Sequence, residues 1–94
     1  MTTKYNYAAF KTHLTTNPKW IARGLQVLHA KDVDVELLVD DAVRLNYMVN
    51  QLAFAKDKKL PWTLDSEYGK EAVKFVTRYA PGIYRFYVRE RTTP

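Results

Sequence analysis

The fold is decided by residues 34–55, which read DVELLVDDAVRLNYMVNQLAFA. Apolar side chains recur there at intervals of three and four residues, the spacing that lines one face of an α-helix: Val35, Leu38, Ala42, Leu45, Val49 and Leu52. The spacing predicts a helix from about Asp34 to Ala55, roughly 33 Å long. Acidic residues gather at its start and lysines follow its end, an arrangement that complements the helix dipole.

Two shorter helices are predicted before this segment. The first covers Lys4–Leu14, and the second runs from Pro18 to about Lys31. Asn17 suits the N-cap of the second helix, because its side chain can accept a backbone N–H, and proline is favoured at the first helical position. Gly24 lies inside this helix at a cost of about 1 kcal/mol relative to alanine, which indicates that a neighbouring helix approaches closely there.

A fourth helix is predicted from Asp65 or Ser66, with its end at residues 80–82, Ala-Pro-Gly. The segment Ile83–Arg91 fits two structures. Its alternating residues are typical of a strand, but Ile83, Tyr84, Tyr87 and Val88 also share one face of a helix. We favour the helix, because a lone strand would find no partner in an otherwise helical chain.

The sequence therefore predicts an all-α fold, a compact single-domain bundle of four to five helices over residues 1–94. Residues 92–94 are expected to fray. The C-terminal segment 83–91 is expected to be a helix, with a short strand as the alternative. The chain has 94 residues, which leaves no room for a second core.

Several function classes are disfavoured by composition. The chain contains no cysteine, so disulfides and thiolate zinc sites are excluded, and a cytoplasmic location is expected. No apolar run reaches the roughly 18 residues that span a bilayer, so no membrane partner is expected. The calcium-loop pattern that starts at Asp32 fails at Leu37, where the loop needs glycine. We also find no catalytic motif, and predict a protein that is no enzyme and binds no metal or cofactor.

Two groups of residues are candidates for nucleic-acid or partner binding. In the C-terminal segment, arginines alternate with aromatic residues, a mixture that can combine phosphate contacts with base stacking; the candidates are Arg85, Tyr87, Arg89 and Arg91. A second basic group is Lys56, Lys58 and Lys59. The alternative interpretation is that these aromatic residues belong to the core and the cations form a solvated rim.

Protein–protein binding is the other class that the composition favours. Tryptophan, tyrosine and arginine dominate interface hot spots, and the candidates here are Trp20, Tyr47 and Trp62. Each of them also fits a place in the core. The net charge is +5, but residues 32–55 are predominantly acidic, so surfaces of opposite sign can dock onto a charged partner or allow self-association.

The stretch Trp20–Leu28, WIARGLQVL, together with Phe10, Lys11 and Asn17 before it, resembles the opening of small uncharacterised proteins of phages and plasmids. Those proteins often end in a basic helix that contains tyrosine, as Lys74–Tyr79 does here. The middle of the chain departs from their pattern. The resemblance implies an origin in a mobile element and carries over no functional residue.

From these observations we expect a small, non-enzymatic accessory protein of phage type. It would bind a host protein or nucleoprotein complex in the host cytoplasm, as an inhibitor or modulator. The alternative is a protein that binds DNA or RNA directly, largely without sequence preference, through its basic and aromatic patches. Self-association is compatible with both.

Overall fold

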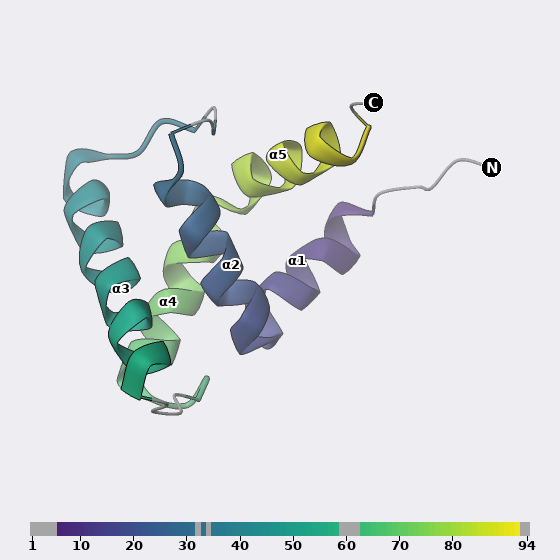
Figure 1. Cartoon of the computed structure of the whole chain (residues 1–94). Coiled ribbons are helices and arrows are strands. Elements are labelled where there is room, and N and C mark those ends of the chain that lie inside the picture. Colours follow the sequence, from purple (N-terminus) through teal and green to yellow (C-terminus); the bar gives the residue numbers. More distant parts are fainter. Residues whose placement is uncertain (1–5, 32, 34, 59–62, 93–94) are drawn as a thin grey trace.

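The computed structural model describes residues 6–31, 33, 35–58 and 63–92, and of residues 55–58, 91 and 92 it describes the backbone alone. They form five α-helices: α1 (Tyr7–Thr16), α2 (Pro18–His29), α3 (Val39–Lys58), α4 (Glu67–Arg78) and α5 (Ala80–Thr92). The described residues contain no strand. The predicted all-α bundle is therefore confirmed, and the C-terminal segment is a helix (Figure 1).

The helix starts follow local capping chemistry. The side chain of Asn6 accepts hydrogen bonds from the backbone N–H groups of the first turn of α1. Asn17 caps α2 as predicted, with Pro18 at the first helical position. Ser66 caps α4 by accepting the N–H of Gly69 at 3.0 Å. The ends differ slightly from expectation: α1 extends to Thr16, and α2 stops at His29 because Ala30 is already extended.

Helix α2 is the centre of the molecule and packs against each of the other four helices (Figure 1). The closest approach is at Gly24. A Cβ atom there would lie 2.9 Å from Leu14 of α1 and 3.5 Å from Val76 of α4 and Ile83 of α5. The predicted role of this glycine is confirmed, since three helices converge on a position that has no side chain.

One hydrophobic core unites the five helices. Its fully buried members come from every helix: Leu14, Ile21, Leu25, Met48, Val76 and Ile83 have no exposed surface. On α2 the buried side consists of Ile21, Leu25 and Leu28, which recur at intervals of four and three residues. Aromatic rings of α1, α2 and α5 pack on one another and extend this core between α1 and α5.

Helix α3 begins at Val39, five residues later than the sequence predicts. Val33, Val35 and Leu37 are half-buried against the core, in a segment that is not helical. Val35 fills the space beside Gly82, where a Cβ atom would lie 2.5 Å from its methyl carbon. Alternate residues thus face the core, so the periodicity of this segment belongs to an extended chain and not to a helix.

The buried face of α3 also differs from the predicted one. The inward side consists of Asp41, Leu45, Met48 and Leu52, whereas Leu38 and Ala42 are exposed. Apolar residues occur on several sides of this helix, so their spacing alone could not identify the side that packs inward.

Helix α5 begins directly after α4, and Tyr79 alone separates them. The sequence predicts that residues 80–82 end a helix, but in the structure they form the first turn of α5. A proline is tolerated there because the N–H groups of a first turn have no partner within the helix.

Gly24→Val is expected to lower the free energy of unfolding by about 1–3 kcal/mol, because a branched side chain would force Leu14, Val76 and Ile83 apart. Urea denaturation followed by circular dichroism measures the change. Gly24→Ala is the matched control: its methyl group is too close only to the terminal methyl group of Leu14, and alanine raises the helix propensity, so the change should be smaller. Equal stability of the valine variant and the natural protein would contradict this packing.

Candidate functional site

Exposed apolar surface gathers on one helix. In the part of the chain that the structure describes, the exposed large hydrophobic residues are Leu38, Val39, Val43, Tyr47 and Phe54, with exposed fractions of 63%, 81%, 69%, 58% and 52%. All five belong to α3 or directly precede it. A concentration of apolar side chains on one surface is typical of an interaction site, whereas single exposed ones are ordinary.

We define the outer face of α3 by seven exposed residues: Val39, Ala42, Val43, Asn46, Tyr47, Asn50 and Ala53. They lie on the side of the helix opposite the buried Leu45, Met48 and Leu52. Helix α3 forms one side of the molecule, with α2 and α4 beside it and the free ends of α1 and α5 on the far side (Figure 1). The helix therefore has two apolar faces, one packed in the core and one facing solvent.

A buried carboxylate fixes the start of α3. Asp41 is 6% exposed, and its Oδ2 accepts hydrogen bonds from the Tyr79 hydroxyl at 2.5 Å and from an Arg78 guanidinium nitrogen at 2.8 Å. The Tyr79 hydroxyl also accepts the backbone N–H of Leu38 at 3.3 Å. These bonds join the start of α3 to the junction between α4 and α5.

The same contacts perturb the titration of these groups. The hydrogen bond from Tyr79, followed by the contacts with Arg78, lowers the pKa of Asp41 although burial acts in the opposite direction. Burial and the bond to Asp41 raise the pKa of Tyr79. Asp41 is therefore ionised at neutral pH and acts as an acceptor of both hydrogen bonds.

A second bridge joins α3 and α4 near the middle of α3. The Tyr68 hydroxyl donates a hydrogen bond to the backbone carbonyl of Met48 at 2.9 Å. Burial raises the pKa of Tyr68 to about 12, so this hydroxyl keeps its proton at neutral pH. The two bridges hold α3 with one side toward the protein and the outer face toward solvent.

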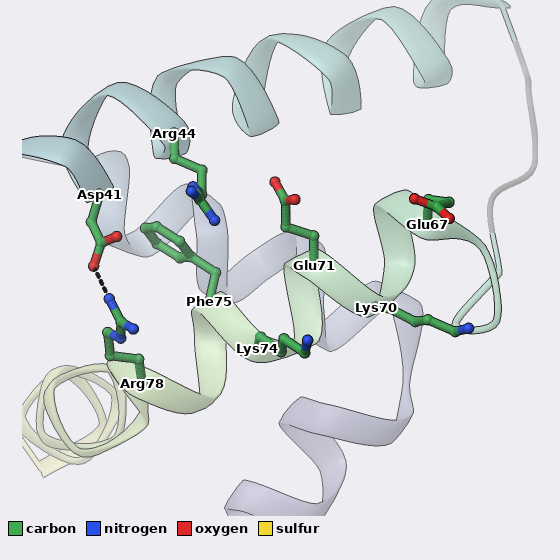
Figure 2. A pocket seen from close by; sticks show the side chains of 8 residues that line it. All are labelled: Asp41, Arg44, Glu67, Lys70, Glu71, Lys74, Phe75 and Arg78. Carbon is green, nitrogen blue, oxygen red and sulfur yellow. Dashed lines mark hydrogen bonds and ion pairs between the residues drawn. The ribbon is translucent and has the colours of Figure 1, made fainter.

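Between α3 and α4 lies a polar cavity of about 360 Å³ (Figure 2). Arg44 of α3 points toward α4, and Glu71 of α4 points toward α3. Most of the remaining lining is charged as well: Asp41, Glu67, Lys70, Lys74, Phe75 and Arg78. Cations and carboxylates alternate along α4, so no single charge dominates this cavity, and it offers no cradle for one class of ion.

The C-terminal candidates lie on α5. Arg85 and Arg89 are exposed beside a hollow of about 400 Å³ that Tyr84 and Phe86 also line, and the Arg89 guanidinium lies 5.7 Å from the Phe86 ring centre. Tyr87 is different. It is 6% exposed and packs against Phe10, so its ring is part of the core and offers no face for base stacking.

The basic candidates do not form one surface. Lys56 and Lys58 belong to the last turn of α3, and that end of α3 lies at the opposite end of the molecule from α5 (Figure 1). The side chains of Lys56, Lys58 and Arg91 lie outside the described part, as does all of Lys59. The structure thus separates two groups that a continuous phosphate-binding surface would bring together.

The three hot-spot candidates have different surroundings. Trp20 is half-buried and packs edge-on against Phe10 at 5.8 Å and Tyr87 at 5.9 Å, so it supports the core. Tyr47 is exposed and lies on the outer face of α3. Trp62 lies outside the described residues.

The outer face itself was missed by the sequence analysis, which assigned α3 a single apolar stripe. A signal was present. Val39, Val43, Asn46, Asn50 and Ala53 recur at alternating intervals of four and three residues, the spacing of a helix that packs against another helix. This second repeat lies on the opposite side of the helix from the buried Leu45, Met48 and Leu52.

Neither a metal centre nor a membrane span is found in the described residues. No group of three or more histidine, aspartate or glutamate side chains there could hold a metal ion. No described helix is both long and apolar enough to cross a bilayer. Comparison with family models, curated proteins and solved structures finds no match to this chain.

Tyr79→Phe is expected to lower the free energy of unfolding by about 1–3 kcal/mol at pH 7, because it removes a hydrogen bond to an ionised carboxylate. The lowered pKa of Asp41 means that its stabilising effect is present above the ordinary value of 3.8 and is lost as the pH falls through the folded-state pKa. The difference between the variant and the natural protein should therefore shrink at pH 3.

Urea denaturation at both pH values measures this effect. Tyr47→Phe is the matched control: it removes a tyrosine hydroxyl from an exposed position and should change the free energy of unfolding little at either pH. A Tyr79→Phe difference that is equally large at pH 3 would contradict the proposed role of the Asp41 charge.

Proposed function

We propose that the protein acts by binding another protein chain through the outer face of α3, without catalysis. The observation that carries the proposal is the gathering of exposed Val39, Val43 and Tyr47 on one helix that is anchored on its other side. Burying such side chains gains roughly 25 cal/mol per Å² of apolar surface. The two bridges to α4 hold the face in place before binding, which reduces the entropic cost of association.

The setting we propose is that of a phage-type accessory protein that inhibits or modulates a host protein or nucleoprotein complex in the host cytoplasm. The support is the resemblance carried by Trp20–Leu28 and Lys74–Tyr79. Size is compatible with a stoichiometric mode of action: a standard interface takes about 800 Å² from each partner, and this chain exposes 6891 Å².

Direct nucleic-acid binding is the second candidate. The observation in its favour is the hollow on α5, where exposed Arg85 and Arg89 flank the half-buried Tyr84 and Phe86. Against it stand the burial of Tyr87 and the distance between α5 and the lysine-bearing end of α3. A short basic surface supports fewer phosphate contacts and correspondingly weaker binding.

Val43→Glu is expected to weaken partner binding at least about tenfold, because the interface would have to bury an unpaired carboxylate. The measurement is an affinity pull-down with tagged protein from bacterial lysate that also contains untagged copies of the chain. Ala9→Glu is the matched control, since it adds the same charge to an exposed position of α1. Retention of the same partners in the same amounts by the Val43→Glu variant would contradict the proposal.

A gel shift of the natural protein with DNA and RNA distinguishes direct nucleic-acid binding from the proposed protein binding. Nucleic-acid binding predicts a shift at about 50 mM salt that weakens steeply toward about 200 mM and is lost in an Arg85→Glu, Arg89→Glu variant. We expect no shift at the lower salt concentration, and unchanged protein binding in the arginine variant.

A further inference from the structure

We infer that the chain seated on the outer face of α3 is a second copy of this protein, paired antiparallel to form a symmetric dimer. The inference rests on the proposed function, because it names the partner of the same face. The outer face carries a repeat of five exposed residues: Val39, Val43, Asn46, Asn50 and Ala53. Intervals of four and three residues form the contact line of one helix against another, so the partner presents a helix.

Polar complementarity identifies which helix this is. Asn46 and Asn50 lie in the middle of the outer face, and an apolar partner helix would bury their amides without hydrogen bonds, at a cost of about 1–3 kcal/mol each. Two antiparallel copies related by an axis at the middle of α3 place Asn46 of each copy opposite Asn50 of the other. Each amide then has a donor and an acceptor in front of it.

Shape complementarity follows from the same register. Val43 of one copy faces Ala53 of the other, so a large side chain meets a small one on both sides of the axis. The axis lies near the centre of α3 (Val39–Lys58), so the pairing extends over nearly the whole helix, about 30 Å. Because the contact is the same on both copies, it closes after two chains and forms no filament.

Charge favours the antiparallel direction. The exposed acid at the start of α3 is Asp40, and the sequence of its last turn contains two lysines and one acid, a net positive charge: Lys56, Asp57 and Lys58. Antiparallel pairing sets the acidic start of each helix beside the lysine-containing end of the other, and also opposes the two helix dipoles. Parallel pairing would set acid beside acid.

The pairing leaves much of the molecule accessible. Helix α3 lies at one side, whereas α5 and the start of α1 lie at the other (Figure 1). A dimer would therefore leave helix α5 of both copies accessible to solvent.

The absence of cysteine from the natural chain allows a direct test of the register. Full-length Val43→Cys and Ala53→Cys variants are mixed and oxidised with oxidised glutathione. The mixture should form a disulfide-linked dimer at least about tenfold faster than either variant alone. In the antiparallel register two copies of position 43 are about 15 Å apart along the axis, beyond the roughly 7 Å that a disulfide spans.

Gln26→Cys, at an exposed position of α2, gives the rate of random collisions. Light scattering of the natural protein from about 1 µM to 1 mM should show a mass that rises from 11.0 kDa toward twice that value, and Val43→Glu should remain at 11.0 kDa. Circular dichroism confirms that each variant is folded.

Rapid cross-linking of Val43→Cys alone would indicate parallel pairing and would overturn the inference. A mass of 11.0 kDa at every concentration, with the mixture no faster than the Gln26→Cys background, would overturn it as well. In that second case the proposed function still stands if Val43→Glu loses a different protein in the pull-down, and it fails if no partner depends on Val43.

Discussion

The arrangement of this protein depends on the buried carboxylate of Asp41. Helix α3 carries apolar side chains on two sides, so burial of apolar surface alone does not determine which side faces the core. An ionised group in the interior must keep its hydrogen-bond partners, and those of Asp41 are Tyr79 and Arg78 at the junction of α4 and α5. This requirement fixes the rotation of α3 about its axis, and with it the identity of the face that remains in solvent.

Much of the fold was predictable, because its signals are local. Asn17 and Pro18 indicate a helix start through capping chemistry. Gly24 indicates that other helices approach α2 closely, because glycine is unfavourable inside a helix unless the space of a side chain is needed. The predicted start of α3 was wrong because Val35 belongs to an extended segment, and its side chain packs on Gly82. This contact joins residues far apart in the chain, so local patterns could not predict it. Tyr87 was predicted to bind a partner because it alternates with arginines, but its ring packs against aromatic neighbours on α1 and α2, which the sequence could not show.

The two surfaces considered for binding differ in how the fold supports them. The outer face of α3 is continuous, lies on a single helix and is held by hydrogen bonds at Asp41 and Met48. The basic candidates are divided between α5 and the end of α3, which lie at opposite ends of the molecule. A binding site needs side chains that converge, and among the described residues the outer face of α3 provides a larger such set than the hollow on α5. The small size of the chain is compatible with this role, since two copies can share one interface and so enlarge the common core.

Pairing of two copies through α3 is tested most directly by the nuclear magnetic resonance spectrum of the isotope-labelled protein, recorded as its concentration rises from about 10 µM to 1 mM. Chemical-shift changes should grow with concentration and be confined to the outer face of α3, with Val43, Asn46 and Asn50 the most affected. Changes centred on Arg85 and Arg89 of α5, or a spectrum that does not vary with concentration, would contradict the claim that α3 joins two copies of this chain.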